Sequence, residues 1–501
     1  MKALPPPAGF EGELRPYQVR GYSWIVKNCE LGLGCLLADD MGLGKTVQLI
    51  AAVRALKNRG FFNEGRCMVV APASLLINWQ REFERFAPEL TVEIFHGTER
   101  RLKNGTDRPD VLITSYGVLR RDLNALAGQD YRLMVLDEAQ AIKNAKTAQA
   151  QAVKDFQAPV VVALTGTPVE NRLFEYWSIL STVQPGLLGT AKDFQLEFAD
   201  RIEKNRDMEA IERFKAVTAP FMLRRVKTDP KILEELPERN IVDHFTTLNA
   251  RQAALYEDCL KTNFTDLEAL EAKAEALEDE DLKKELNNVR LARRGAILRM
   301  ITHLKQITNS PSQFMKASAE KPDSGKAEAL LEIVERCIEA DRKVLIFTQF
   351  KEMGERLQQW IERAFKLKAD FLHGGLSLNE RTRMVDRFQN DPEAKVFILS
   401  LKAGGTGLNL TAASAVIHYD LWWNPAVEDQ ASDRAWRIGQ RRDVVVYRLI
   451  TAGTFEEKVN AMLTKKRELA DLTVSVGENW IGDLSDDEIK SIFALDRKRR
   501  G

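Results

Sequence analysis

The chain has 501 residues, of which 44% are hydrophobic and 29% are charged. This composition is ordinary for soluble globular domains, and at roughly 150 residues per domain the length predicts about three of them. Collagen-like, disordered and small disulfide-stapled proteins are excluded, because such a chain buries most of its apolar surface without covalent staples. Lys plus Arg and Asp plus Glu both number 73, so the net charge is zero and composition alone does not indicate a polyanionic partner.

The cysteines and the N-terminal segment bear on the compartment. The 5 cysteines are scattered and none forms a CxxC pair, so a zinc site or a disulfide framework is not indicated and a reducing compartment fits better. The sequence has no apolar run of about 18 residues, which is the length of a membrane span. Three prolines at positions 5–7 replace the apolar core of a signal peptide. We therefore expect a cytoplasmic protein.

Short apolar runs rich in β-branched residues recur in both halves of the chain, with helical patterns between them. Continuous apolar strands that alternate with helices are typical of parallel sheets covered on both faces, so we expect an α/β fold with two lobes. In the first half the runs are residues 35–38, 67–71, 111–114, 133–136 and 160–164. In the second half they are residues 344–347, 371–372, 396–399, 415–418 and 444–450.

Other segments have a helical texture. Within residues 262–291, which are dense in Glu, Lys, Leu and Ala, the leucines are spaced as on a helical hairpin or short coiled coil. This helix either packs on its own lobe or binds a partner. The expected organisation is a first lobe at 1–240 with a helical protrusion at about 186–232, a second lobe at 241–470 with a helical insertion at about 247–318, and a tail at 471–501.

The segment DDMGLGKT, residues 39–46, follows an apolar strand and opens an amphipathic helix, which is the context of a phosphate-binding loop. Glycines let main-chain N–H groups turn toward phosphates, and the helix N-terminus adds positive potential. We expect Lys45 to reach the β- and γ-phosphates and Thr46 to ligate Mg²⁺. Asp39 stands in place of the first glycine of the general pattern. The predicted ATP-binding residues of this loop are Asp39, Asp40, Met41, Gly42, Leu43, Gly44, Lys45 and Thr46.

A later apolar strand runs directly into Asp137 and Glu138. A carboxylate at the carboxyl end of a parallel strand points into the ligand crevice. We expect Asp137 to hold Mg²⁺ and Glu138 to orient and deprotonate the attacking water. The next strand ends in Thr165-Gly166-Thr167-Pro168, which is either a simple tight turn or a sensor of the γ-phosphate that couples the site to movement.

In the second half, Asn424 and Pro425 are typical of a helix start. Offsets of four and three place Gln430, Arg434 and Arg437 on one face of that helix. The two arginines are either surface ion-pair residues or mobile positive charge that a second lobe brings to the γ-phosphate.

Several strand ends carry groups suited to the backbone of a nucleic acid. The Gly-rich segment 400–409 offers main-chain amides, a lysine and a threonine, and two strand ends of the first lobe offer hydroxyls and amides. The pair at 422–423 is either core or a surface wedge. The candidate nucleic-acid contacts are Pro72, Ser74, Thr114, Ser115, Tyr116, Lys402, Gly404, Thr406, Asn409 and Trp423.

In this order the motifs resemble those of the Swi/Snf family of helicase-like ATPases in superfamily II, over nearly the whole chain. LRPYQ at 14–18 resembles the adenine-recognition motif, DDMGLGKT and DEAQ motifs I and II, and LTGTP motif III. FMLRR at 221–225 resembles the segment that closes the first lobe. VLIFTQF at 344–350 and LHGG at 372–375 resemble motif IV and the segment after it, SLKAGGTGLNLT motif V, and DQASDRAWRIGQ motif VI.

The resemblance implies two RecA-like lobes that hydrolyse ATP in the cleft between them and move along double-stranded DNA without separating its strands. It also implies ATP and Mg²⁺ as cofactors, a DNA-bound protein to be displaced, further domains or subunits beyond this chain, and association with the nucleoid. By the same resemblance Arg434 and Arg437 are arginine fingers, His373 and Gly374 contact DNA, and the ATP site also includes Arg15, Gln18, Gly405 and Gln440.

Two positions depart from the family pattern. Gln140 stands where many relatives carry His at the end of motif II, and we expect it still to hydrogen-bond to motif III. Trp436 stands where relatives often carry His or Tyr, and it has no predicted role. The compact form resembles a bacterial or archaeal member, and we expect the motor portion of a longer protein.

The leading hypothesis is a DNA-stimulated ATPase that translocates on duplex DNA. A strand-separating DNA or RNA helicase of the same superfamily is one alternative, although no wedge element is identified by sequence. A catalytically silent DNA-binding scaffold is another, and the intact Lys45, Asp137, Glu138, Arg434 and Arg437 argue against it.

Overall fold

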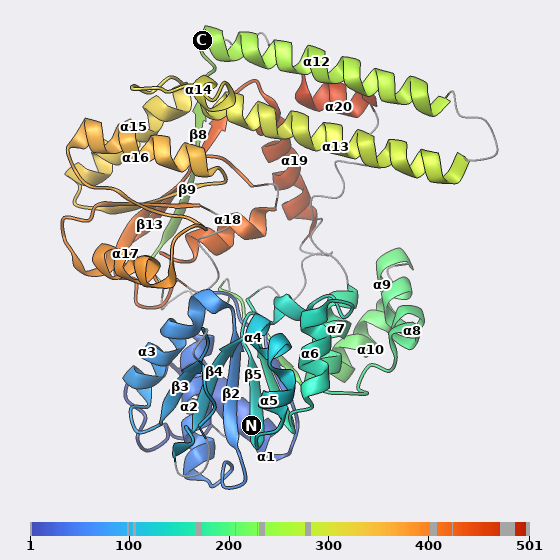
Figure 1. The fold of residues 1–501 in the computed structure, drawn as a ribbon, viewed down its shortest axis with the longest axis vertical. Coiled ribbons are helices and arrows are strands. Elements are labelled where there is room, and N and C mark those ends of the chain that lie inside the picture. Colours follow the sequence, from blue (N-terminus) through green and yellow to red (C-terminus); the bar gives the residue numbers. More distant parts are fainter. Residues whose placement is uncertain are drawn as a thin grey trace. The chain divides into compact units, whose positions relative to one another are not determined.

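The computed structural model describes residues 3–97, 100–103, 107–166, 173–205, 207–227, 229, 236–275, 282–400, 408–422, 424–470 and 486–496. The chain divides into two compact units. Unit 1 is Met1–Leu236 with Thr406–Leu408, and unit 2 is Pro237–Gly405 with Asn409–Gly501. Each unit is built on a parallel sheet covered by helices (Figure 1), which confirms the predicted α/β class.

The sheet of unit 1 has 7 strands in the order β3-β4-β2-β5-β6-β1-β7, and every pairing in it is parallel. Alternate residues of a strand point to opposite faces, so Cys67 and Val69 pack in one hydrophobic cluster and Met68 and Val70 in another. Burial on both faces explains the continuous apolar runs. The strands are β1 (Cys35–Leu37), β2 (Arg66–Ala71), β3 (Val92–Phe95), β4 (Val111–Ser115), β5 (Tyr131–Leu136), β6 (Val160–Leu164) and β7 (Met222–Leu223).

Helices cover both faces of this sheet. One cluster takes side chains from α1 (Pro16–Glu30), α2 (Lys45–Asn58) and α3 (Leu76–Phe86). The other takes side chains from α4 (Tyr116–Arg121), α5 (Leu123–Ala127), α6 (Ala148–Phe156), α7 (Leu173–Val183), α8 (Ala191–Phe194) and α10 (Met208–Thr218). A π turn (Gln195–Ala199) and α9 (Asp200–Asn205) lie between α8 and α10.

The predicted helical protrusion at 186–232 is helical only as far as Thr218. Met222 and Leu223 instead form β7, which pairs with Leu36 and Leu37 of β1. The prediction of a helix throughout is therefore wrong at this point, because two residues of edge strand are too few to show a strand pattern in the sequence.

The sheet of unit 2 has 6 strands in the order β10-β11-β9-β12-β13-β8, again with parallel pairings. Its edge strand β8 (Arg239–Thr246) is absent from the predicted strands, yet it pairs with β13 from Arg239 to Thr246. Most of its side chains are exposed, so it lacks the apolar run that marks a central strand. The other strands are β9 (Lys343–Thr348), β10 (Asp370–Leu372), β11 (Val396–Ser400), β12 (Ala413–His418) and β13 (Val444–Thr451).

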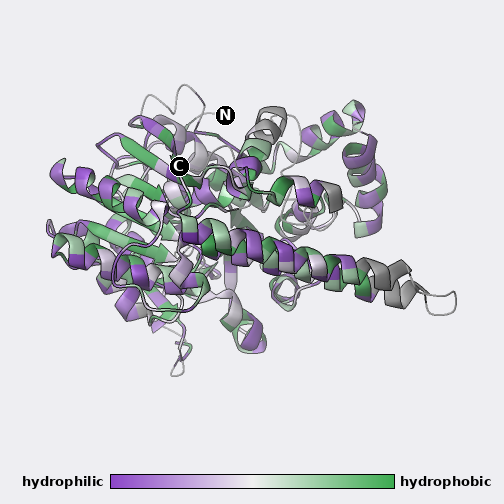
Figure 2. Cartoon of the chain, turned by 90° about the horizontal axis from the view of Figure 1, so that it is seen from above, coloured by the Kyte–Doolittle hydropathy of each residue, from purple (hydrophilic) through white to green (hydrophobic). Residues whose placement is uncertain are grey.

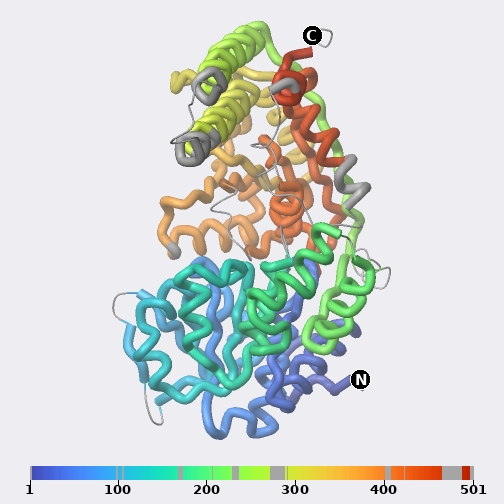
Figure 3. The backbone as a smooth tube through the Cα atoms, turned by 90° about the vertical axis from the view of Figure 1, so that its right-hand side faces the viewer, coloured from blue at the N-terminus to red at the C-terminus, as the bar shows by residue number. Residues whose placement is uncertain are grey.

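The helices of unit 2 flank the sheet and extend beyond it. A long hairpin of α12 (Ala250–Glu275) and α13 (Leu282–Asn309) packs with α19 (Phe455–Ala470) and α20 (Asp486–Phe493) around one hydrophobic cluster. Figure 3 shows the two hairpin helices side by side, and Figure 2 shows that the visible side of the long helix in front carries both hydrophobic and hydrophilic residues. Leu267 and Leu270 pack in this cluster, so the amphipathic stretch packs on its own unit. The remaining helices are α14 (Pro311–Phe314), α15 (Gly325–Glu339), α16 (Lys351–Phe365), α17 (Leu378–Asn390) and α18 (Pro425–Ser432).

Helix α18 begins as predicted and ends earlier than predicted. The Asn424 side chain accepts a hydrogen bond from the Ala426 amide over 3.0 Å and caps the helix. The helix ends at Ser432, so Arg434 and Arg437 follow it in a turn rather than lying on it. The prediction that Gln430 and both arginines share one helix face is therefore wrong.

Candidate functional site

The predicted phosphate-binding loop connects β1 to α2 in unit 1. Gly42 and Gly44 adopt φ angles of +83° and +74°, a left-handed conformation that glycine adopts without steric cost. A Cβ atom on Gly44 would also lie 2.4 Å from Nε2 in the side chain of Gln18. Both conditions require glycine, and the loop leads straight into the first turn of α2, where main-chain N–H groups have no partner within the helix.

Lys45 lies half-buried at the start of α2 and reaches back over the loop. Its Nζ donates hydrogen bonds to the carbonyl oxygens of Asp39 over 2.6 Å and of Asp40 over 3.1 Å. Burial lowers the pKa of Lys45, while Glu138 and, less strongly, the carboxylates of Asp39, Asp137 and Asp40 oppose that shift. The ammonium is thus a desolvated cation at the loop, and it can exchange the two carbonyls for the oxygens of a phosphate.

Asp137 and Glu138 follow β5 on the same side of the sheet. Oδ2 of Asp137 accepts a hydrogen bond of 2.7 Å from Nε1 of Trp79, and the hydroxyl of Tyr116 donates to the carbonyl oxygen of Asp137 over 2.8 Å. Burial and the neighbouring Glu138 raise the pKa of Asp137 to about 7. A site with this much negative charge in little water favours a cation, and Lys45 is close enough to counteract the shift.

The backbone of Glu138 is unusual, because its φ of +49° is rare for a residue with a side chain. Its carboxylate Oε2 accepts a hydrogen bond of 2.6 Å from Nε2 of Gln140. The Thr165 hydroxyl donates in turn to Oε1 of Gln140 over 2.9 Å. The predicted hydrogen bond between Gln140 and motif III is therefore confirmed, and one amide joins the end of β6 to the carboxylate of Glu138.

Gly166, the residue after Thr165 in motif III, lies against the phosphate-binding loop. A Cβ atom built on Gly166 would lie 2.4 Å from Cγ of Met41 and 3.6 Å from Nζ of Lys45. Residue 166 therefore tolerates no side chain next to the loop. Three segments that follow β1, β5 and β6 converge at the carboxyl ends of these strands, where open α/β sheets bind ligands.

A buried ion pair that is not predicted from the sequence joins Asp39 to Arg225. Oδ1 of Asp39 accepts hydrogen bonds from Nε of Arg225 over 2.9 Å and from its main-chain nitrogen over 3.1 Å. The guanidinium also donates to Oε1 of Gln48 over 2.6 Å and lies 5.0 Å over the ring of Tyr17. The side chain of Asp39 is fully buried, so its carboxylate anchors the loop to the segment after β7 and does not face a ligand.

Arg15 and Gln18 lie at the start of α1, next to the loop. Nε2 of Gln18 donates to the carbonyl oxygen of Leu43 over 3.2 Å, and Oε1 of Gln18 accepts from the main-chain nitrogen of Arg15 over 3.0 Å. The hydroxyl of Tyr17 donates to the same Leu43 carbonyl over 3.1 Å. Gln18, predicted to bind adenine, thus contacts the loop itself, and Arg15 contacts Gln18.

The side chains predicted in unit 1 to hold a nucleic acid are mostly engaged within the unit. The Thr114 hydroxyl donates to the carbonyl oxygen of Phe95 over 2.9 Å, and Ser115 caps α4 by accepting from the Val118 amide. Tyr116 is bonded to Asp137, and all three side chains are buried. Each of these hydroxyls thus holds a neighbouring segment of unit 1, and their contact with a nucleic-acid backbone stays a prediction. Pro72 and Ser74 lie half-buried around a short turn at Ala73–Leu75.

In unit 2, Gln440 has a structural role. Its Nε2 donates to the carbonyl oxygens of Ala413 over 2.6 Å, Thr411 over 3.0 Å and Ala435 over 3.1 Å. Its Oε1 accepts from two main-chain amides. The amide thus joins the segment after α18 to β12, and the place of Gln440 in the ATP site stays a prediction.

The same segment holds the two predicted arginine fingers. Arg434 is buried and Arg437 is half-buried. Between them, Nε1 of Trp436 donates to the carbonyl oxygen of Pro237 over 2.8 Å, and the guanidinium of Arg239 lies 5.2 Å over its ring. Trp436, for which the sequence indicates no role, therefore ties this segment to β8.

Of the remaining predicted contacts, the structure describes His373, Gly374 and Asn409. His373 and Gly374 follow β10, Gly374 is exposed, and Nη2 of Arg381 donates to the Gly374 carbonyl oxygen over 3.0 Å. Asn409 is exposed. Residues Thr167, Pro168, Lys402, Gly404, Gly405, Thr406 and Trp423 lie outside the described residues.

The described residues contain neither a metal-ligand cluster nor a membrane-spanning helix. No cluster of three or more His, Cys, Asp or Glu side chains there is arranged to hold a metal ion. None of the helices described is both long and apolar enough to span a bilayer.

Comparison with known proteins identifies the family. Residues 17–313, more than half of the chain, match the SNF2-related domain, and residues 325–439 match the helicase conserved C-terminal domain. The chain is 42% identical over 495 residues to YwqA of Bacillus subtilis (strain 168), whose name describes it as an ATP-dependent helicase/translocase, and this match covers 97% of the chain and 51% of YwqA. It is 36% identical over 482 residues to an uncharacterized ATP-dependent helicase of Mycoplasma pneumoniae, covering 96% of the chain and 44% of that protein.

The chain thus spans about half the length of these curated relatives. Among solved structures, it is similar to the Sulfolobus solfataricus SWI2/SNF2 ATPase core in complex with dsDNA. That match has 38% identity and a TM-score of 0.48, and it covers 99% of this chain and 100% of the other.

Proposed function

This chain belongs to the SNF2-related family, and from that premise we propose that it hydrolyses ATP and uses the energy to move along double-stranded DNA. The observation that carries the proposal is the convergence of Lys45, Asp137 and Glu138 beside a glycine loop in unit 1. These are the residue types that phosphoryl transfer needs: a cation for the phosphates, a carboxylate for the metal and a second carboxylate for the water. A silent scaffold would need none of them.

The loop fits the phosphates of ATP. Lys45 already spans the loop and donates to two carbonyls, which are weaker partners than phosphate oxygens. The positive φ angles of Gly42 and Gly44 leave the main-chain amides of the loop free of side-chain obstruction. Gln18, which contacts Leu43, and Arg15, which contacts Gln18, then border the side on which we propose the adenine lies.

The donor set also fits Mg²⁺. Magnesium is usually held by one or two protein oxygens together with substrate phosphates and water, so a dedicated cage of protein ligands is not needed. Thr46, in the first turn of α2, and Asp137, with its raised pKa, are the residues we propose as ligands. When bound, the ion neutralises charge on the phosphates.

Glu138 is the base in this proposal. Its carboxylate is held by Gln140, which leaves the other carboxylate oxygen to accept a proton from an attacking water. Because Gln140 also accepts from Thr165, a shift at the end of β6 would be transmitted to the base through a single amide. This geometry supports a link between the γ-phosphate end of the site and the segment that follows β6.

We propose that unit 2 contributes Arg434 and Arg437 to hydrolysis. Both follow α18 in a segment fixed by Gln440 and Trp436, so their main chain is well anchored. Mobile positive charge from a second unit would stabilise the charge spread over the γ-phosphoryl group in the transition state. As part of the same proposal, the motor displaces a DNA-bound protein. It works together with further domains or subunits.

The experiment that tests movement on duplex DNA uses displacement of a labelled third strand. The protein is mixed with ATP and a duplex that carries a triplex-forming oligonucleotide, and in parallel with a tailed duplex that reports strand separation. We expect release of the third strand, dependent on ATP and abolished by Lys45→Ala, with no unwinding of the tailed duplex. Unwinding without third-strand release would instead identify a strand-separating helicase.

A further inference from the structure

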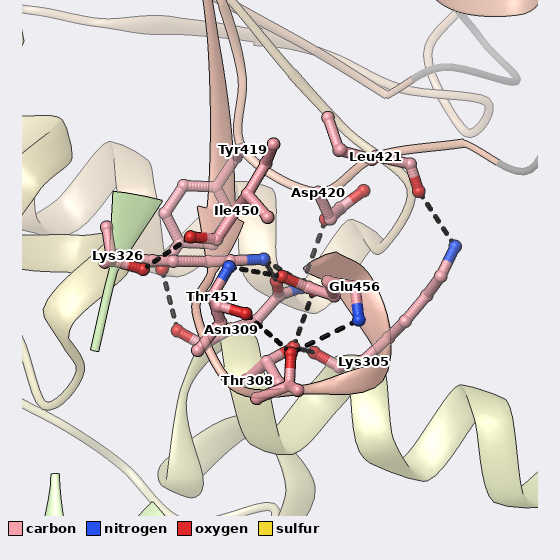
Figure 4. A network of polar contacts seen from close by, with 12 residues as sticks. Lys305, Thr308, Asn309, Lys326, Tyr419, Asp420, Leu421, Ile450, Thr451 and Glu456 are labelled. Atoms are coloured by element: carbon pink, nitrogen blue, oxygen red, sulfur yellow. Dashed lines mark hydrogen bonds and ion pairs between the residues drawn. The ribbon is translucent and has the colours of Figure 1, made fainter. Parts of the chain in front are cut away.

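A network of buried polar side chains fills the carboxyl ends of three strands in unit 2 (Figure 4). At its centre, Nζ of Lys326 donates to Oε1 of Glu456 over 2.7 Å, and both side chains are almost completely buried. The Thr308 hydroxyl donates to the same Glu456 oxygen over 2.8 Å, and the main-chain nitrogen of Thr451 donates to the other carboxylate oxygen over 2.9 Å. The network thus joins α13, α15, the end of β13 and α19.

Asp420 forms the second centre of the network, just after β12. Its Oδ2 accepts from the Thr348 hydroxyl over 2.6 Å and from Nδ2 of Asn309 over 3.1 Å, and its Oδ1 accepts from the Gln349 amide over 2.8 Å. The Tyr419 hydroxyl donates to the carbonyl oxygen of Asn309 over 2.8 Å. The end of α13 is therefore tied to the ends of β9 and β12. In unit 1 the corresponding edge of the sheet carries the phosphate-binding loop.

Lys305 lies one turn before the end of α13. It differs from the other members of the network because it binds a main-chain carbonyl in the segment between β12 and α18. Only 5% of its surface is exposed. Its Nζ donates to the carbonyl oxygen of Leu421 over 2.9 Å and to Oε1 of Gln349 over 3.3 Å, while Nε2 of Gln349 donates to the same Leu421 carbonyl over 2.7 Å. Two donors thus fix one carbonyl, and one of them comes from the helical hairpin.

The fixed carbonyl lies on the path from β12 to α18. The next main-chain amide, that of Trp422, donates to Oε1 of Glu428 in α18 over 2.8 Å. The other oxygen of Glu428 accepts from Nε of Arg448 over 3.0 Å. The segment between the sheet and α18 is therefore held on one side by Lys305 and on the other by α18 itself.

We propose that Lys305 is a positioning residue for ATP hydrolysis, which fixes the chain at Leu421 and thereby the placement of α18 and of the two arginines that follow it. The inference rests on the proposed function, because it assigns those arginines to the hydrolysis reaction. It goes further in linking the hairpin of α12 and α13 to them through the ammonium group of Lys305, beside the hydrogen bond from Asn309 to Asp420. Any load on the hairpin that displaces α13 is then felt at the segment before α18.

The charge of Lys305 makes this contact sensitive to pH. Burial lowers the pKa of Lys305 to about 8, and the opposing carboxylates do not restore its usual value. An ammonium donates stronger hydrogen bonds to a carbonyl than a neutral amine does. The contact with Leu421 is therefore strongest below that pH and weakens above it. The charged and titratable groups around Lys305 are Asp420 after β12, Glu456 on α19, Lys326 on α15, Glu428 on α18 and Arg448 on β13.

Two substitutions separate the charge from the packing. Lys305→Met keeps the apolar stem and removes both hydrogen bonds that Lys305 donates. Lys305→Arg keeps a cation that stays charged at every accessible pH. A cavity of about 20 Å³ beside Lys305, bordered by Trp422 and Leu463, leaves room for part of the larger group.

Lys343 supplies the matched control. Like that of Lys305, its Nζ donates two hydrogen bonds, in this case to the main-chain carbonyl oxygens of Phe388 over 2.6 Å and Asp391 over 2.7 Å. It lies at the start of β9, at the opposite end of the strand from Gln349. Lys343→Met therefore removes an equivalent pair of hydrogen bonds without touching the segment before α18.

The test measures kcat and KM for ATP of the full chain with duplex DNA between pH 6.5 and 9.5. For Lys305→Met we expect kcat to fall about tenfold, with KM for ATP within about twofold of wild type, as for loss of a charged hydrogen bond. We expect the wild-type kcat to fall as the pH rises through about 8, where Lys305 loses its proton. In Lys305→Arg that alkaline decline moves to higher pH, and Lys343→Met behaves as wild type.

A normal kcat in Lys305→Met, or an alkaline decline unchanged in Lys305→Arg, would overturn the inference. Amide hydrogen exchange of α18 gives a readout that does not need turnover. Faster exchange in Lys305→Met than in Lys343→Met supports the positioning role, and equal exchange contradicts it. If wild type itself fails to hydrolyse ATP, the proposed function is wrong, and the exchange measurement still decides the role of Lys305.

Discussion

Arg225 and Asp39 lie 186 residues apart in the chain and form a buried ion pair that anchors the phosphate-binding loop. Asp39 occupies the position at which the general loop pattern has glycine. Asp39 accepts from the main chain of residue 225 as well as from its guanidinium, so the loop is joined both to a side chain and to the segment after β7. The loop of unit 1 therefore depends on a residue far from any recognised phosphate-binding motif.

This relationship predicts an asymmetric response to mutation. Arg225→Met leaves the Asp39 carboxylate buried without its cation, and we expect a loss of about 3–5 kcal/mol in the free energy of unfolding. Asp39→Asn, combined with Arg225→Met, should recover part of that loss because no uncompensated charge remains. Urea unfolding of the single and double variants measures the coupling. Additive losses in the double variant would show that the two side chains act independently.

The chain of hydrogen bonds from Thr165 through Gln140 to Glu138 predicts a defect in turnover. Thr165→Val removes the donor, frees Gln140 to rotate and leaves the base without a fixed orientation. We expect kcat for ATP to fall about tenfold, with little change in ATP affinity, since a misplaced base costs rate and not binding. Thr165→Ser keeps the hydroxyl and serves as the control. Equal rates in the two variants would contradict the link between the end of β6 and the base.

Arg437→Ala is expected to slow hydrolysis strongly while nucleotide affinity barely changes. An arginine that acts only in the transition state is worth about 10³-fold or more in related phosphoryl transfers. Steady-state turnover together with binding of a fluorescent ATP analogue separates the two effects. Arg441→Ala, an exposed arginine just beyond the segment, is the control. An effect confined to affinity would assign Arg437 to ground-state binding.

His418 predicts a specific loss of stability in acid. Burial, with smaller contributions from Arg448 and Arg239, lowers the pKa of His418 to about 3, so the folded chain keeps the ring neutral while the unfolded chain protonates near pH 6.5. The stabilisation is therefore complete above pH 6.5 and is lost as the pH falls toward 3. At pH 5 the loss is about 2 kcal/mol, at about 1.4 kcal/mol per unit of pH. Thermal unfolding at pH 7.5 and 5.0 should show a smaller acid loss in His418→Gln than in wild type, and equal losses would contradict this assignment.

The parts of the site that sequence predicts best are those whose chemistry is carried by neighbouring residues. The glycines, Lys45 and Thr46 lie within one strand–loop–helix unit, and Asp137 and Glu138 end one strand, so local pattern and strand topology suffice to place them. The hydrogen bond from Thr165 to Gln140 is also predictable, because both residues lie within a few positions of the carboxyl ends of neighbouring strands.

Long-range partners and side-chain orientation were not predictable in this way. The acid in place of the first loop glycine indicates that a cation is needed, but nothing in the sequence identifies Arg225 as that cation. The hydroxyls at the end of β4 suit a nucleic acid by residue type, yet Thr114 and Tyr116 turn inward to carbonyls of neighbouring segments. Gln440 also suits a nucleotide by residue type, yet in the structure its Nε2 donates hydrogen bonds to three main-chain carbonyl oxygens.

The most direct test of the central claim is the steady-state rate of ATP hydrolysis by the full chain, alone and with duplex DNA, single-stranded DNA or RNA. Lys45→Ala provides the blank, and Glu138→Gln provides a variant expected to bind ATP without turning it over. The account predicts strong stimulation by duplex DNA alone, which declines steeply with salt because contacts with phosphates dominate binding. Stimulation mainly by single strands or RNA, or normal turnover in Glu138→Gln, would contradict it.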